Sequence, residues 1–464
     1  MEKNKEFLGT EPIGKLLFKL AIPTVIAQLV NMLYNIVDRV YLGHMPVDGS
    51  LALTGVGVCT PIILFVSAFA ALICSSGAPR ASIFMGEGDY NKAEETMGNC
   101  FTLQTVVSLL ITALLVIFSD DLLWAFGASE NTIGYATEYM NIYALGTIFV
   151  QLTLGMNAYI TAQGNAKMAM LTVVIGAVCN IILDPIFIFG LDMGVAGAAL
   201  ATIISQSVSC LWVVSLLFGK RSTLRLKKQY LRVKPKIVLP CIALGMATFI
   251  MQVSESVISV AFNSSLLKYG GDVAVGAMTI LTSVMQFAML PMQGIGQGAQ
   301  PITSYNYGAK NVDRVKKTFR LLLIICLSYS VLVGTTVLVF PKVFAGIFCS
   351  DVTLLDFTAR ALRIYMGGMV IFGIQIACQM TFVSIGNAIC SIIVAVVRKF
   401  VLLMPLIYLV PYFTADKTMG VYLAEPIADV IAVSFTAILF SVQFKKAIKG
   451  LQKHDAQPTC VEAD

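Results

Sequence analysis

Long apolar runs separated by short polar segments follow one another from about residue 16 to residue 442. A helix needs about 20 apolar residues to cross a bilayer, whereas a barrel strand shows about ten residues of alternating polarity. The runs have the helical length and lack the alternation. They predict twelve transmembrane helices, near residues 16–41, 51–76, 98–118, 134–161, 168–190, 194–218, 237–264, 273–300, 319–340, 356–384, 388–412 and 419–442. The predicted fold class is an all-α polytopic membrane protein.

The second half of the chain repeats the first at an offset of 222 residues. Pro79 returns as Pro301, and the Gly-Asn-Ala of Gly164–Ala166 returns as Gly386–Ala388. Six spans per half is an even number, so both halves share one orientation in a parallel repeat. We therefore expect two pseudo-symmetric six-helix bundles. The predicted boundaries are an N-lobe over 1–218, a basic linker over 219–236, a C-lobe over 237–446 and a polar tail over 447–464.

The composition narrows the class of protein. Apolar residues make up 57% of the 464 residues and charged residues only 12%, against roughly 25% charged in a soluble domain. The two histidines and the scattered cysteines form no metal-binding spacing. The chain also lacks an ATPase motif and a catalytic constellation. We expect a transporter driven by an ion gradient, not an enzyme, with no cofactor beyond H⁺ or Na⁺ as coupling ion.

Lysine and arginine predict the orientation. Most of the 32 cations fall on the side that holds the N-terminus and the linker. The other side holds Arg39, Lys268, Lys342, Arg360, Arg363 and Lys417. Because cytoplasmic loops carry the excess of positive charge, both termini are predicted to be cytoplasmic. The loop cations need no nucleic-acid partner to explain them, and we expect a monomer in the lipid bilayer.

Polar groups inside the N-terminal spans are the first candidate site. Buried polar groups in lipid are costly and usually face a pathway. Asn180 and Asp184 share one face of the fifth span, and Pro185 is expected to break the helix and free carbonyl ligands. The other members of this set are Gln28, Asn35 and Asp38 in the first span, Asn157 in the fourth and Thr202 in the sixth.

Oxygen atoms of this kind suit Na⁺, at Asp38, Asn180 and Asp184, or a proton on a carboxylate. Hydrogen bonding between helices is the alternative role for the same side chains. The repeat favours a cation site in the N-terminal half alone, because Leu406 and Ala428 stand where Asp184 and Thr202 would recur.

The C-terminal half carries a second polar set. Gln252 and Glu255 lie in the seventh span, and Gln286 lies between Met285 and Met289 in the eighth. A wall rich in methionine adapts to varied shapes and suits lipophilic cations. Ordinary packing is the alternative for the methionines. These residues, with Gln28 and Asn35, are the predicted lining of a substrate cavity.

Charged residues also lie within the eleventh and twelfth spans. Arg398 and Asp429 are predicted at equal depth, from a rise of about 1.5 Å per residue. They form either a structural ion pair or a coupling element.

At this point the sequence resembles the MATE (multidrug and toxic compound extrusion) family over nearly the whole chain, in its DinF-like and MepA-like bacterial branch. The resemblance rests on Pro23, Asn35-x-x-Asp38, Gly43, Asn157, Gln163-Gly164-Asn165, Asn180-x-x-x-Asp184-Pro185, Gly194-x-x-Gly197 and Thr202. It implies a V-shaped pair of lobes in a bacterial plasma membrane that exports cationic amphipathic compounds in exchange for H⁺ or Na⁺. It also assigns the N-lobe cation site to Asp38, Asn157, Asn180, Asp184 and Thr202.

The resemblance is incomplete in the C-terminal half. Glu255 matches the acid in the seventh span of NorM-like members, but Gly373-Ile374-Gln375-Ile376 lacks their aspartate in the tenth. Glu255 is thus a candidate to neutralise a cationic substrate. A flippase for a lipid-linked oligosaccharide, found among related folds, is the alternative function. It would need a cavity lined by several cations, whereas the candidate cavity residues here are neutral or acidic.

Overall fold

The computed structural model describes residues 7–45, 49–219, 222–348 and 352–455, and over these ranges all regular structure is helical. Eleven helices are long and apolar enough to cross a membrane. One of them, α9 (Pro235–Gly308), has 74 residues and leaves helical geometry at Gly271, where φ is +64°. Glycine tolerates this value because it has no Cβ. The predicted spans 237–264 and 273–300 lie on the two sides of Gly271, so the eleven helices accommodate twelve spans.

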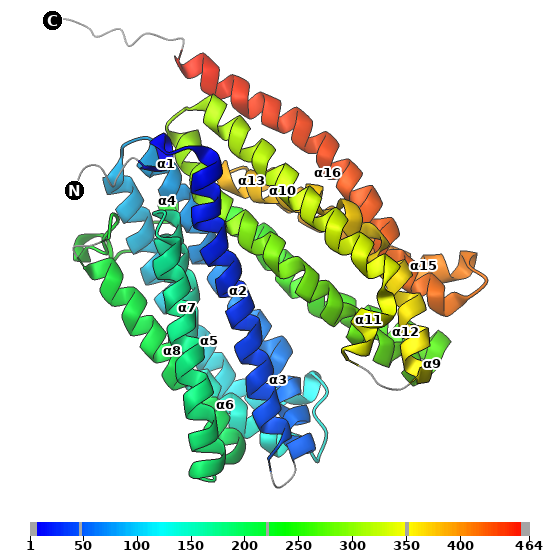
Figure 1. The fold of residues 1–464 in the computed structure, drawn as a ribbon. Helices are drawn as coiled ribbons and strands as arrows, with labels where there is room; N and C mark the ends of the chain where they lie inside the picture. The colour runs from blue at the N-terminus through cyan, green and yellow to red at the C-terminus, as the bar shows by residue number, and fades with distance from the viewer. Residues whose placement is uncertain (1–6, 46–48, 220–221, 349–351, 456–464) are drawn as a thin grey trace, which may run out of the picture. The chain divides into compact units, whose positions relative to one another are not determined.

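The described chain divides into two compact units (Figure 1). One unit holds residues 19–81 and 90–253, and the other holds 1–18, 82–89 and 254–464. The helices α2, α4 and α9 run from one unit into the other. Of the predicted tail 447–464, residues 456–464 lie outside the described residues, as do residues 220–221 of the linker. The lobe boundaries proposed from the sequence stay a prediction.

Helix α6 is central to the 19–253 unit, where it packs against α3, α5, α7 and α8. Small residues allow this close packing: a Cβ on Gly146 would collide with Ile203, and one on Gly155 would lie 2.6 Å from Cys74 Cβ. Association in lipid depends on such close contacts because apolar burial provides no net driving force there. The helices and turns that begin in this unit are α2 (Ile13–Gly43), α3 (Gly49–Ala70), a π-helical turn (Ala71–Ser75), α4 (Ser76–Gly86), α5 (Tyr90–Ala125), α6 (Ile133–Ala162), α7 (Ala166–Pro185), a π-helical turn (Ile186–Gly190), α8 (Gly194–Phe218), a 3-10 turn (Lys228–Tyr230) and α9.

The other unit is organised around α13, which packs against α10, α14 and α16. A Cβ on Gly373 would collide with the backbone of Cys326 in α10, and Phe319, Phe440 and Phe444 stack nearby. Its remaining elements are α1 (Phe7–Thr10), α10 (Val312–Val339), α11 (Pro341–Gly346), α12 (Val352–Tyr365), a 3-10 turn (Met366–Gly368), α13 (Met369–Ser384), α14 (Ala388–Val396), a π-helical turn (Val397–Leu403), α15 (Met404–Phe413) and α16 (Lys417–Asp455).

The repeated Gly-Asn-Ala marks the same turn in both units. Gly164 follows α6 with φ of +80°, and Gly386 follows α13 with φ of +74°. A left-handed residue after a helix is usually glycine. Asn165 and Asn387 then stand at the N-caps of α7 and α14. The recurrence of these residues therefore has a local structural cause.

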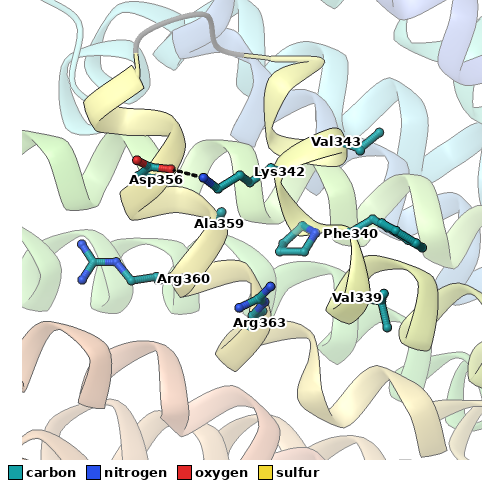
Figure 2. Close-up of a pocket in the computed structure, with 9 residues that line it drawn as sticks. Val339, Phe340, Lys342, Val343, Asp356, Ala359, Arg360 and Arg363 are labelled. Carbon is teal, nitrogen blue, oxygen red and sulfur yellow. Dashed lines mark ion pairs between the residues drawn. The ribbon is translucent and has the colours of Figure 1, made fainter.

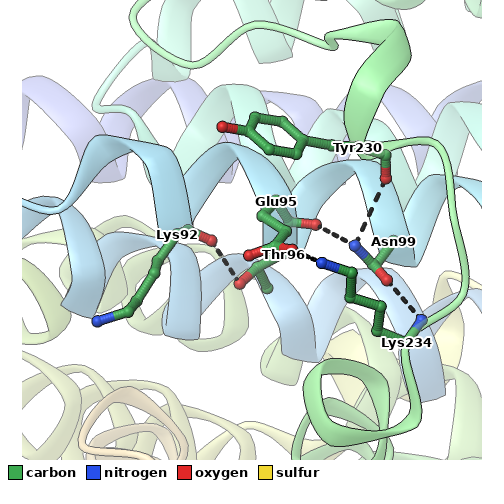
Figure 3. A network of polar contacts seen from close by, with 6 residues as sticks. All are labelled: Lys92, Glu95, Thr96, Asn99, Tyr230 and Lys234. Atoms are coloured by element: carbon green, nitrogen blue, oxygen red, sulfur yellow. Dashed lines mark hydrogen bonds and ion pairs between the residues drawn. The ribbon is translucent and has the colours of Figure 1, made fainter.

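The basic linker is docked on α5 within the 19–253 unit (Figure 3). Asn99 Oδ1 accepts a hydrogen bond from the Lys234 backbone N–H at 2.7 Å, and Lys234 Nζ pairs with Glu95 at 2.5 Å. Glu94 pairs with Lys227 and accepts from the Arg225 N–H at 3.1 Å. The acids of α5 thus hold the segment that the sequence shows only as a basic run.

Candidate cation and substrate sites

The strongest polar site of the 19–253 unit lies between α7 and α8. Asn180 Nδ2 donates to Asp184 Oδ1 at 3.0 Å and lies 3.5 Å from Thr202 Oγ1. Asp184 is 0% exposed and Asn180 1%. Asp184 Oδ2 and Asn180 Oδ1 have no hydrogen-bond partner, although a buried oxygen normally has one. The structure thus brings together three of the predicted cation-site residues and leaves two of their oxygens unsatisfied.

Asp38 in α2 belongs to the same site. Its carboxylate is close enough to Asp184 for their charges to interact, and its Oδ1 is also buried without a partner. The unsatisfied oxygens of Asp38, Asn180 and Asp184 are the donor set that Na⁺ prefers, and either carboxylate can hold a proton. No group of three or more His, Cys, Asp or Glu side chains suited to a metal occurs within the described ranges, so a Na⁺ ion would need the Asn180 amide oxygen.

Asn157 makes no printed contact with this group. Its Nδ2 donates to the Ala169 carbonyl in α7 at 3.2 Å, and its Oδ1 is unsatisfied. Its observed bond joins α6 to α7. This is the inter-helix role that the sequence left open.

Sequence reasoning missed the tyrosines of this site. The hydroxyls of Tyr139 and Thr202 are hydrogen-bonded, and the Tyr139 and Tyr143 rings stack with centroids 6.2 Å apart. Both are buried in α6. Their spacing of four residues within one predicted span was the available signal.

The break predicted after Pro185 is wrong. Helix α7 continues into the π-helical turn Ile186–Gly190, whose wider winding accommodates the missing N–H of proline. This turn carries the chain from the Asp184 site towards α8. Such turns occur frequently at functional sites.

The predicted substrate-cavity residues divide between the two units. Gln28, Asn35 and Gln252 belong to the 19–253 unit, and Glu255, Met285, Gln286 and Met289 to the other. Met285 is buried and Gln286 is exposed, so their common span does not give them a common environment. Asn35 Nδ2 donates to the Asn31 carbonyl at 2.6 Å.

A network of five charged side chains lies in the other unit. Arg398 donates from Nε to Asp429 at 2.8 Å and from Nη2 to Glu425 at 3.1 Å. Its guanidinium also lies 4.5 Å from the centre of the Phe372 ring. The neighbouring Lys399 donates to Glu255 at 2.7 Å. The structure therefore confirms the predicted contact of Arg398 with Asp429 and adds Glu425 and Lys399.

Lys399 changes the environment of Glu255. The Lys399 side chain is only 5% exposed, while that of Glu255 is 58% exposed. Glu255 already has a resident cation, which sequence reasoning did not assign to it. Any cation that binds Glu255 would do so beside the Lys399 ammonium.

Comparison with known proteins gives one family. A family model described as MatE matches residues 23–186 and 247–409, two segments that begin 224 residues apart, as the internal repeat requires. The multidrug export protein MepA of Staphylococcus haemolyticus (strain JCSC1435) is 26% identical over 362 residues, covering 78% of this chain and 79% of that protein. MepA of Staphylococcus aureus (strain NCTC 8325 / PS 47) is 22% identical over 375 residues, covering 79% and 81%.

Solved structures share the fold. A MATE protein crystallised in complex with MaD3S matches with a TM-score of 0.89 at 24% identity, over 97% of this chain and 99% of that one. A MOP superfamily transporter from Pyrococcus furiosus matches with a TM-score of 0.88 at 24% identity and the same coverage.

Proposed function

The chain belongs to the MatE family, and from this premise we propose that it is a secondary antiporter that exports cationic amphipathic compounds in exchange for H⁺ or Na⁺. The observation that carries the proposal is the buried group of unsatisfied oxygens on Asp38, Asn180 and Asp184. Such a group lacks one positive charge and one set of hydrogen-bond donors. A proton or a Na⁺ ion supplies what it lacks.

Each residue of the site has a distinct task. Asp184 is the main acceptor of the coupling ion, because it is fully buried and has one free oxygen. Asn180 orients the other Asp184 oxygen and offers its own amide oxygen. Thr202 fixes Asn180 against α8. Asp38 connects the site to α2, so that uptake of the ion changes the packing of α2.

This coupling through α2 gives a route to exchange. Removing the repulsion between Asp38 and Asp184 favours one packing of α2, and the bound compound is released outward when that packing forms. A ligand shifts such an equilibrium only by its difference in affinity for the two states. In the proposed orientation both termini are cytoplasmic and the protein alternates access between the two sides of the membrane as a monomer.

The substrate class rests on charge and on the relatives. Two relatives are named multidrug export proteins. The described candidate cavity residues are neutral or acidic, with Glu255 as the exposed acid. An exposed carboxylate favours a cationic group.

The experiment is dye efflux from proteoliposomes under an imposed pH or Na⁺ gradient. We expect ethidium transport by the wild type, and transport by Asp184→Asn at the level of protein-free liposomes. Asp121→Asn makes the same chemical change at an exposed position of α5 and should transport normally. Whichever gradient drives efflux identifies the coupling ion.

Undiminished efflux by a correctly folded Asp184→Asn protein contradicts the proposed site. Transport of a fluorescent lipid-linked oligosaccharide, with no gradient-driven transport of any cationic dye, would instead support the flippase alternative. Wild-type monodispersity and melting temperature for both variants ensure that loss of transport is not loss of folding.

A further inference from the structure

We propose that the surface pocket between α11 and α12 binds the headgroup of an anionic glycerophospholipid. The pocket has a volume of about 600 Å³ and lies where α10, α11 and α12 meet. Its lining combines apolar side chains with charged ones: Val339, Phe340, Pro341, Lys342, Val343, Asp356, Ala359, Arg360 and Arg363 (Figure 2). A lining of this kind suits an amphiphile.

The pocket lies at the level where headgroups lie. The candidate spans on either side end at Val339 and begin at Leu354. The segment between them, with α11 and the first turns of α12, therefore lies at a membrane surface. This placement does not depend on which side of the membrane the surface faces.

The charges favour an anion. Lys342 Nζ pairs with Asp356 at 2.7 Å across the pocket, which joins α11 to α12 (Figure 2). Arg360 and Arg363 follow on the same helix, exposed to solvent. Among the residues that the structure describes, neither guanidinium makes an ion pair within 4.0 Å or a hydrogen bond. The pocket therefore has an excess of two positive charges, and arginine binds phosphate through parallel hydrogen bonds.

The apolar side of the pocket has room for acyl chains. Val339 and Phe340 are each 57% exposed and Val343 is 63% exposed, next to Ile347 at 71%. Behind them Ala345, Ala361 and Leu362 are buried and form a firm base. Apolar side chains beside a basic pocket at the headgroup level match a phospholipid better than a free anion, which needs no such wall.

The cation distribution strengthens the argument. Only six lysines and arginines are predicted on the side opposite the linker, and Lys342, Arg360 and Arg363 are three of them. Loops on that side carry few cations by topology. Three of them in one pocket therefore call for a local reason, which an anionic lipid provides.

The test is retention of lipid by the full-length protein in neutral detergent, followed by native mass spectrometry. The probes are dioleoyl phosphatidylglycerol, dioleoyl phosphatidylcholine and inorganic phosphate. The wild type should retain phosphatidylglycerol in preference to phosphatidylcholine. The double variant Arg360→Gln/Arg363→Gln should bind it about thirty-fold more weakly, from about 1 kcal/mol per arginine near a charged headgroup.

Matched controls separate a pocket from general charge. Lys268→Gln/Lys417→Gln removes two cations outside the pocket and should leave retention unchanged. Arg360→Lys/Arg363→Lys keeps the charge and should retain part of the preference, and Val343→Ser should weaken both lipids. Equal loss in the Lys268/Lys417 control, no preference in the wild type, or full displacement by equimolar inorganic phosphate would each overturn the proposal. No arm involves transport, so the result is independent of the proposed antiport.

Discussion

The two halves of this chain put polar groups at the same level of the repeat but balance them in opposite ways. In the 19–253 unit, Asp184 and Asn180 have buried oxygens without a partner, and no cation is bonded to them. In the other unit, Arg398 and Lys399 are bonded to Asp429, Glu425 and Glu255. The first site lacks a positive charge that the second already contains. A site of the first kind accepts a mobile cation, and a site of the second kind is occupied by tethered ones.

The repeat shows how one scaffold supports both arrangements. At the offset of 222 residues, Arg398 and Lys399 correspond to Gly176 and Ala177, and Asp184 corresponds to Leu406. Each charged group therefore has a neutral counterpart in the other half. Both sites also adjoin a π-helical turn, Ile186–Gly190 after Asp184 and Val397–Leu403 around Arg398. The backbone irregularity is shared, while the charge differs.

The largest expected effect comes from removing the tethered cation. Arg398→Met leaves Glu425 and Asp429 buried without a partner, which should lower the free energy of unfolding by about 3–5 kcal/mol. Thermal unfolding of the purified protein measures it. The exposed substitution Arg232→Met should change stability by less than about 0.5 kcal/mol.

A rescue variant separates the two roles proposed for this network. Arg398→Met/Glu425→Gln/Asp429→Asn removes all the buried charges together and should recover most of the lost stability. Normal dye efflux by the rescued protein assigns the network a structural role. Loss of efflux at recovered stability would assign it to coupling and would end the contrast drawn between the two sites.

A smaller, asymmetric effect is expected at Glu255 and Lys399. Glu255→Gln leaves the buried Lys399 ammonium unpaired and should cost about 2–3 kcal/mol. Lys399→Met leaves a half-exposed carboxylate that water can solvate, and should cost about 1 kcal/mol or less.

Denaturation curves of the two single variants and of the double variant measure this difference. The double variant should be close to Lys399→Met, because the unpaired ammonium is absent from both. Equal costs for the two single variants would mean that Glu255 is as poorly solvated as Lys399. The exposed acid could then not serve to attract a cationic compound.

The fold was largely predictable because its signals are local. Twelve apolar runs set the spans, and the merging of two of them in α9 depends on a single residue, Gly271. Asp38, Asn180, Asp184 and Thr202 were predictable because a polar residue inside a lipid span stands out against its neighbours.

Partnerships between distant segments were harder to predict. The pairing of Lys399 with Glu255 spans 144 residues, and no periodicity in either helix announces it. Tyr139 looks like an ordinary aromatic residue of a buried span until α8 brings Thr202 beside it. The winding after Pro185 depends on how the chain re-satisfies a freed carbonyl, which proline alone does not determine.

The smallest expected effect compares the two copies of the Gly-Asn-Ala turn. The Asn387 side chain accepts a hydrogen bond from the Cys390 N–H at 3.2 Å and caps α14, whereas Asn165 makes no such bond at the start of α7. Asn387→Ala should therefore cost about 1 kcal/mol and Asn165→Ala only a few tenths. Thermal unfolding of the two variants, with Asn311→Ala at the capped start of α10 as a positive control, measures the difference. Equal costs would mean that Asn165 caps α7 in the folded protein, and that the halves share this turn in its side-chain bonding as well as in its backbone.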